Sequence, residues 1–203
     1  PGIAVDGSGN VYVTGAWSNN AFKITPGGTI TEIIDAAGDG SNRLEWPHGI
    51  AVDAVGNVYL VGYQSDNAFK IAPDGTITEI IDATGDGNGN TLSEPVGIAV
   101  DASLNVYVTG RVSDNAFKIA LDGTITEIID HSGDGSSVFE EPYRVAVDAS
   151  GNVFVACYAS DNAFRISAEG TIMEFIDYQG DGASILNTAI GVATAGSGNV
   201  YVT

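Results

Sequence analysis

The stretch that decides the fold is residues 49–59, GIAVDAVGNVY, because it returns along the chain at a nearly constant interval. Copies begin at Gly2, Gly49, Gly97, Arg144 and Gly191, in steps of 47, 48, 47 and 47 residues. They divide the chain into units of about 2–48, 49–96, 97–143 and 144–190, with a partial unit at 191–203. A period of this size is typical of repeat architectures such as solenoids and propellers.

Each unit predicts four short strands, which we name a, b, c and d. In the second unit they are residues 49–53, 58–61, 68–71 and 76–81, all rich in β-branched or aromatic residues. Short turns of Gly, Asn, Asp or Pro separate them, which favours antiparallel hairpins. No segment has a helical period. The sequence therefore predicts an all-β fold, a β-propeller with four complete four-stranded blades plus half of a fifth.

Composition excludes several classes of partner. The chain has 7 Lys and Arg against 26 Asp and Glu, a formal net charge of −19, which repels phosphates and excludes nucleic acid as a partner. No apolar run approaches the ~18 residues needed for membrane insertion. The acidity and the scarcity of lysine favour an extracellular or cell-surface protein, of bacterial origin.

The repeating pattern P-x-G-I-A-V-D-x-x-G-N-V-Y-V, followed by N-A-F-K-I-x-x-D-G-T-I-T-E, resembles NHL-type propeller repeats and those of the virginiamycin B (streptogramin) lyase group. The resemblance implies six or seven blades, so four and a half units indicate a fragment or a ring completed by another copy. It also implies a histidine base and a divalent metal acting on a cyclic depsipeptide. His48 is the one position that matches this base, and it lacks a second histidine partner.

The order of the strands separates two ends of each blade. The a–b and c–d turns share one end and hardly differ between units, whereas the b–c turns and the long d–a loops share the other and vary. We call these the uniform end and the variable end. A varied rim on a uniform scaffold is typical of binding surfaces in repeat proteins. The candidate ligand-binding residues at the variable end are Trp17, His48, Tyr63, Arg111, Tyr143, Arg144 and Tyr158. Packing between blades is the alternative interpretation of these aromatic residues.

The d–a loops share the pattern Asp-x-x-Gly-Asp-Gly, which is similar to the start of a calcium loop. The third position never offers Asp or Asn, and only the third loop has Glu at the twelfth, so an Asp-Gly turn without metal is the alternative. The candidate calcium ligands, in the second and third loops, are Asp82, Asp86, Asn88, Asn90, Asp130, Asp134, Ser136 and Glu141.

A second repeated feature is a basic residue in strand c and a glutamate in strand d, which predicts cross-strand charge pairs. These residues are Lys23, Lys70, Lys118 and Arg165, with Glu32, Glu79, Glu127 and Glu174. No serine elbow, phosphate loop or zinc spacing is present.

We therefore expect a noncatalytic module that binds a protein or a small molecule at its variable end. The alternatives are a lyase-like enzyme that uses His48 and a metal, and a structural module completed by self-association through its incomplete blade.

Overall fold

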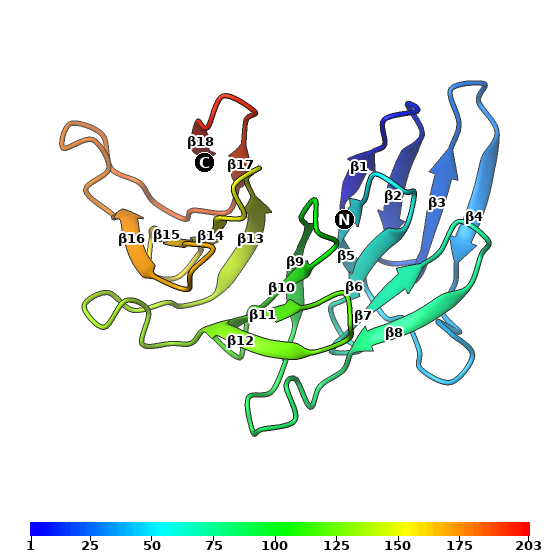
Figure 1. Ribbon diagram of the computed structural model, residues 1–203, viewed down its shortest axis with the longest axis horizontal. Helices are drawn as coiled ribbons and strands as arrows, with labels where there is room; N and C mark the ends of the chain where they lie inside the picture. The colour runs from blue at the N-terminus through cyan, green and yellow to red at the C-terminus, as the bar shows by residue number, and fades with distance from the viewer.

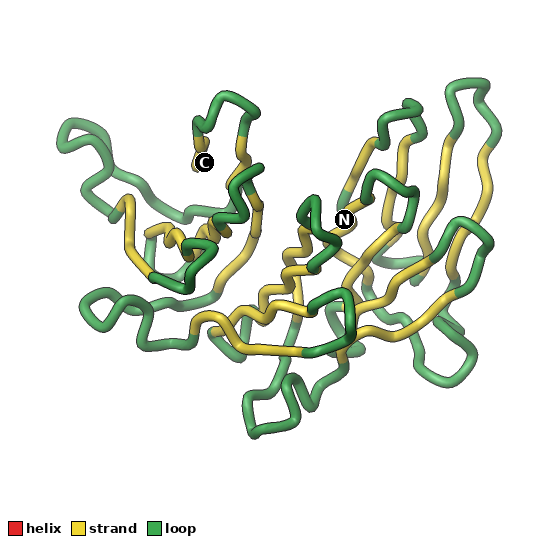
Figure 2. The backbone as a smooth tube through the Cα atoms, in the orientation of Figure 1, coloured by secondary structure: helices red, strands yellow, loops and turns green.

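The computed structural model describes residues 1–203 and contains strands, turns and loops only (Figure 2). It has no helix that is long and apolar enough to cross a membrane. The first sheet contains β1 (Ile3–Val5), β2 (Val11–Gly15), β3 (Asn20–Ile24) and β4 (Ile30–Ile34). The second contains β5 (Pro47–Val52), β6 (Val58–Gly62), β7 (Asn67–Ile71) and β8 (Ile77–Ile81).

The remaining strands repeat this order. The third sheet contains β9 (Pro95–Val100), β10 (Val106–Gly110), β11 (Asn115–Ile119) and β12 (Ile125–Ile129). The fourth contains β13 (Pro142–Val147), β14 (Val153–Cys157), β15 (Asn162–Ile166) and β16 (Ile172–Ile176). A two-stranded sheet follows, with β17 (Val192–Thr194) and β18 (Val200–Val202). Every neighbouring pair within a sheet is antiparallel.

The sheets are arranged as blades. Their first strands pack against one another in sequence, β1 on β5, β5 on β9, β9 on β13 and β13 on β17. Figure 1 shows the blades following one another along an open arc, from β1–β4 on the right to β13–β16 on the left. The predicted β-propeller with four full blades and half of a fifth is therefore confirmed.

Strand boundaries lie close to those expected from the sequence. In the second blade, strand b ends at Gly62 rather than at Val61, and strand a begins at Pro47, two residues before the repeated motif. In the first blade, the β1–β2 and β3–β4 turns lie together at the upper end of the sheet, opposite the β2–β3 turn (Figure 1). The two ends of each blade are therefore arranged as the strand order predicts.

Alternate residues of each strand serve two different interfaces, because both faces of an inner blade are covered. On β6, Leu60 packs toward the first blade, whereas Tyr59 and Val61 pack toward the third. This explains why the b strands are apolar throughout rather than alternating with polar residues. The result is three separate apolar clusters, one between each pair of neighbouring full blades.

No other blade of this chain covers the outward face of the first blade, so that face is exposed. Ile3 is 68% exposed, whereas Ile50, at the same position in the second blade, is 8% exposed. Val5 and Ile30 on the same face are also exposed. The apolar pattern of a blade is thus independent of whether a neighbour covers it in this chain.

A hydrogen-bonded aspartate holds each a–b turn at the uniform end. In the second blade, Asp53 Oδ1 accepts the backbone N–H groups of Val55 and Asn57, and Oδ2 accepts the Asn57 amide and the Tyr59 hydroxyl. Asp6 and Asp101 make the same set of bonds. The repeated D-x-x-x-N-x-Y pattern is therefore a turn with its polar groups satisfied.

The predicted cross-strand charge pairs were wrong. Lys70 on β7 lies opposite Thr78, and Glu79 lies opposite Phe69, so the two charges occupy adjacent positions and face away from each other. Instead, Glu79 accepts a hydrogen bond from Asn67 at 2.8 Å. The glutamates of the other full blades are bound in the same way by Asn20, Asn115 and Asn162.

Candidate functional site

The variable end contains a hollow of about 340 Å³ near the inner strands. Its lining residues come from the starts of β5 and β13, the ends of β6, β10 and β14, and the loop before β5. They are Trp46, His48, Tyr63, Arg111, Tyr143 and Tyr158. Five of the seven sequence-predicted ligand-binding residues therefore line one concave surface, which is the usual form of a small-molecule site.

A repeated backbone connection brings these side chains together. Glu94, the last residue before β9, has a φ of 48°, and its N–H donates to Asp66 Oδ1 of the preceding blade at 2.7 Å. Its carbonyl accepts the N–H of Arg111, the residue after β10, at 3.2 Å. The same two bonds join Trp46 to Asn19 and Tyr63, and Glu141 to Asp114 and Tyr158. The residue before strand a and the residue after strand b are therefore neighbours in each blade.

Arg111 lies between two carboxylates. Its Nε and Nη2 donate to Glu141 Oε2 at 3.1 and 2.7 Å, and its Nη1 donates to Glu94 Oε2 at 3.0 Å. The Tyr63 hydroxyl also binds Glu94 Oε2 and accepts from Arg111 Nη1. Burial by itself lowers the pKa of Arg111, but the hydrogen bonds to Glu141 raise it overall. The cluster is thus a fixed ion-pair network in which one guanidinium is shared by two carboxylates.

Aromatic rings form two walls beside this network. One wall contains Trp17, Trp46 and Tyr63, with the Trp17 and Trp46 centroids 4.5 Å apart and those of Trp46 and Tyr63 6.5 Å apart. The other wall, from the fourth blade, contains Tyr143 and Tyr158, whose centroids are 6.3 Å apart. Arg111, from the third blade, lines the same hollow, which therefore combines tilted aromatic rings with a charged group.

His48 belongs to the first of these walls. Its ring stacks on Tyr63 with a centroid separation of 5.0 Å. Burial, together with the positive charges of the terminal amine and Arg144, lowers the pKa of His48 from 6.5 to about 4. The imidazole is therefore neutral and only weakly basic at neutral pH.

Two predicted residues lie outside the lining. Trp17 is 85% exposed and touches the hollow through its contact with Trp46. Arg144, in β13, donates from Nη2 to the carbonyl of Pro1 at 3.5 Å. Arg144 therefore contributes positive charge close to His48 without lining the hollow.

Sequence reasoning missed Trp46 and Glu94, and assigned Glu141 to a metal. All three stand directly before the proline that opens strand a, which is the signal that could have aligned them. Counting from the loop aspartate placed Ser93 at this position in the second unit, because that loop is one residue longer than the others. The positive φ values of Trp46, Glu94 and Glu141 show the correct equivalence.

The aspartate carboxylates of the d–a loops accept hydrogen bonds from groups in the turns of the same loops. Asp82 Oδ1 accepts the N–H and hydroxyl of Thr84, and Asp86 accepts the N–H of Asn88 and the side-chain amides of Asn88 and Asn90. In the third loop Asp130 binds Ser132, and Asp134 binds the N–H groups of Ser136 and Ser137. The structure contains no group of three or more His, Cys, Asp or Glu residues placed to hold a metal ion.

Close packing explains the first glycine of the Asp-x-x-Gly-Asp-Gly pattern in these loops. Gly85 has a φ of 63°, and a Cβ there would lie 1.8 Å from the Asn90 carbonyl oxygen and 3.1 Å from the Phe117 ring. The loop is thus folded tightly onto the next blade, and only glycine fits. The Asp-x-x-Gly-Asp-Gly pattern therefore has a structural explanation, and calcium binding stays a prediction.

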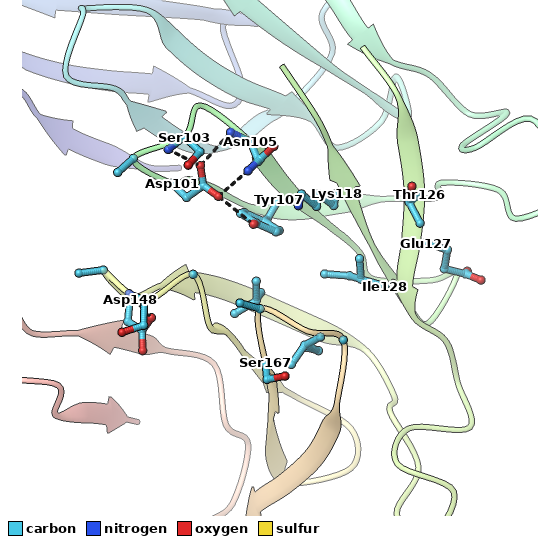
Figure 3. Close-up of a pocket in the computed structure, with 18 residues that line it drawn as sticks. Asp101, Ser103, Asn105, Tyr107, Lys118, Thr126, Glu127, Ile128, Asp148 and Ser167 are labelled. Atoms are coloured by element: carbon cyan, nitrogen blue, oxygen red, sulfur yellow. Dashed lines mark hydrogen bonds between the residues drawn. The ribbon is translucent and has the colours of Figure 1, made fainter. Parts of the chain in front are cut away.

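A second hollow, of about 550 Å³, lies at the other end of the blades, between the third and fourth (Figure 3). Its wall carries Asp101, bound to Ser103, Asn105 and Tyr107, all in the repeated turn network. A similar hollow lies between the second and third blades, lined in part by Tyr59 and Lys70. Because it recurs between blades and its polar groups serve the turns, we regard it as a consequence of the blade geometry.

A family model described as Beta-propeller repeat matches residues 1–22 and 37–63. A search of curated protein sequences finds no significant match. These results agree with the repeat architecture, and neither of them assigns a function.

Solved structures match along the whole chain. Virginiamycin B lyase from Staphylococcus aureus aligns with a TM-score of 0.75 at 18% identity, over 100% of this chain and 62% of the lyase. A streptogramin B lyase structure aligns with a TM-score of 0.78 at 18% identity, over 100% of this chain and 61% of that one. A nidogen–laminin complex gives 0.74 at 23% identity, over 100% of this chain and 70% of that one. The chain thus shares the propeller fold and spans about three fifths of the lyases' length.

Proposed function

We propose that this protein is a noncatalytic binding module, and that its ligand site is the hollow at the variable end. The observation that carries the proposal is the convergence of residues from three blades, Tyr63, Arg111 and Tyr158 among them, on one concave surface. Aromatic residues and arginine are the types that dominate binding energies. The site faces the end where the units differ, whereas the opposite end repeats one turn network.

The charge state of the hollow favours binding over proton transfer. Its one histidine, His48, has a pKa of about 4 because of burial, and its one arginine is held by Glu94 and Glu141. A general base is most effective when its pKa lies near the working pH. An extracellular location belongs to the same proposal and is supported by the net charge of −19.

A lyase-like activity is the second candidate, favoured by the position of His48 in the lining. One of the similar structures is a catalytically inactive virginiamycin B lyase with quinupristin, and another is the nidogen–laminin complex. Propellers of this shape therefore include both an enzyme and a member of a protein assembly, so the activity has to be tested directly.

The chain has two tryptophans, and both lie at the site, so their fluorescence reports on it selectively. We would titrate the protein with quinupristin, neutral oligosaccharides and a peptide library. The mass of each probe would then be measured by mass spectrometry to show whether it has been converted. We expect saturable binding of at least one probe, which is recovered unchanged. Arg111→Met should weaken it by about tenfold or more, a loss typical of a central binding residue.

The matched control is Lys118→Met, which removes the same charge from the same blade at the hollow of Figure 3. Its affinity should stay that of the parent protein. Conversion of quinupristin that disappears in His48→Ala would replace the proposal with the lyase alternative. A loss of binding in Lys118→Met alone would move the site to the opposite end, and the absence of saturable binding would also contradict the proposal.

A further inference from the structure

We infer that the hollow at the variable end accepts a neutral saccharide chain, an assignment that rests on the proposed function and gives its ligand a chemical class. The aromatic walls, the balance of charge and the free hydrogen-bonding groups of the hollow all favour this class.

The walls suit the carbon–hydrogen faces of sugar rings. Trp46 and Tyr63 form one wall and Tyr143 and Tyr158 the other, and these walls belong to different blades. Amphipathic aromatic rings supply broad apolar contact and keep polar edges available. A ligand that touches both walls must contact residues of the second and the fourth blade, which favours a chain of rings over a single one.

The charge balance disfavours ionic ligands of either sign. An anion meets the chain's net charge of −19 and finds Arg111 already bound to Glu94 and Glu141. A cation finds no free counter-charge either, because Glu94 and Glu141 are both paired with Arg111 and a second guanidinium, that of Arg144, lies close to His48. A neutral ligand avoids both penalties, since it needs no counter-charge from the site.

The free hydrogen-bonding groups are mostly acceptors. Both carboxylates bind Arg111 through Oε2, so Oε1 of Glu94 and Oε1 of Glu141 take no hydrogen bond within the chain. The three Arg111 nitrogens together donate four hydrogen bonds to carboxylate or hydroxyl oxygens, whereas the hydroxyls of Tyr143 and Tyr158 have no partner. A ligand rich in hydroxyl groups supplies the donors that this set lacks.

The test uses calorimetry and tryptophan fluorescence with neutral hexasaccharides of glucose, mannose, galactose and N-acetylglucosamine. Hexasaccharides of galacturonic acid and of glucosamine serve as the anionic and cationic comparators, and tetramethylammonium and a basic peptide as other cations. We expect one or more neutral hexasaccharides to bind with a Kd below about 1 mM. The charged hexasaccharides should have a Kd at least about tenfold higher.

Variants separate stacking from general damage. Tyr158→Ala should weaken binding by about tenfold, and Tyr158→Phe, which keeps the ring, by much less. The matched control is Val112→Ala, because Val112 stands where Trp17 stands in the first blade, is 54% exposed, and lies outside the lining. Unchanged thermal melting of all three variants shows that they fold.

Three results would overturn the inference. Failure of every neutral hexasaccharide to bind, while a peptide, quinupristin or a cationic probe binds in an Arg111-dependent way, rejects the saccharide and leaves the binding module standing. Saccharide binding that Tyr158→Ala does not weaken places the sugar elsewhere and rejects the site. Failure of all probes, neutral, charged and peptide, rejects both the ligand class and the proposed function.

Discussion

The two ends of the blades use the same strands in opposite ways. At the uniform end, Asp6, Asp53 and Asp101 make one set of bonds to the next Asn and Tyr. At the variable end, the corresponding positions after strand b hold Ala16, Tyr63, Arg111 and Tyr158, and the contacts differ from blade to blade. One end repeats its chemistry, and the other changes it.

The difference shows how a repeat chain can vary a surface without losing its fold. The backbone of the variable end is also held by repeated bonds, but these run from Asn19, Asp66 and Asp114 to backbone N–H groups of the next loop. The side chains of Trp46, Glu94 and Glu141 are therefore released from any role in closing the loop. They can change in size and charge while the connection persists.

The largest expected effect is a loss of stability from a substitution at the uniform end. Asp53→Ala leaves the amide of Asn57 and the hydroxyl of Tyr59 without an acceptor in a buried turn. We expect the free energy of unfolding to fall by about 2–3 kcal/mol, the range for buried donors left unsatisfied. Chemical denaturation of the parent and the variant measures it.

The fourth blade supplies the matched control. Asp148 binds Ser150 and Asn152 in the same way but has Phe154 where the other blades have tyrosine. Asp148→Ala should therefore cost about 1 kcal/mol less than Asp53→Ala, the usual net value of one hydrogen bond. Equal losses would show that the tyrosine hydroxyl contributes nothing to the turn.

A smaller effect concerns His48 at the variable end. Burial lowers the pKa of His48 from 6.5 to about 4, so between these values the unfolded chain binds a proton that the folded chain does not. Stability linked to His48 is therefore fully present above pH 6.5 and is lost as the pH falls toward 4. The melting temperature should fall a few degrees further in the parent than in His48→Gln over this range.

Carboxylates titrate in both proteins, so the difference between the two melting curves isolates His48. Parallel curves from pH 7 to pH 4 would contradict the lowered pKa. They would also weaken the view of His48 as a neutral stacking residue beside Tyr63.

The smallest expected effect is that of calcium on the d–a loops. The calcium hypothesis for residues 82–90 and 130–141 remains a proposal, supported by the count of oxygen ligands in each loop. Because Asp82, Asp86, Asp130 and Asp134 already accept bonds from their own turns, we expect calcium to raise the melting temperature by about 1 °C or less. Calorimetric melting after chelator treatment, with and without 1 mM calcium, roughly 10 times a weak-site Kd, measures it. A rise of several degrees that Asp86→Asn abolishes would make these loops a metal site.

The architecture follows from the sequence because its cause is local and repeated. Runs of β-branched and aromatic residues such as 58–61, and turn residues such as Gly56, fix strands and hairpins within each unit. The period then fixes the succession of blades. The position of the variable end could also be predicted from the sequence, since strand order alone assigns the turns to two ends.

The contacts across the variable end were harder to predict from the sequence, for a geometric reason. The pairing of Arg111 with Glu94 and Glu141 joins residues 17 and 30 positions apart, through two backbone positions of positive φ that ordinary residues occupy. Neither glutamate is marked as left-handed by its residue type. The prediction of cross-strand charge pairs failed for a related reason, because a shift of one residue in strand register turns a side chain to the other face.

The division of the core into three clusters has a consequence for how the molecule comes apart. Each cluster is shared by two neighbours, so the second and third blades belong to two clusters and the first blade to one. Such a chain behaves as a line of coupled units whose free energies add along its length. Within this chain, fraying then starts at the two ends of the arc in Figure 1, where Ile3 and Val5 of the first blade and Tyr201 of β18 are exposed, while β6 and β10 melt last.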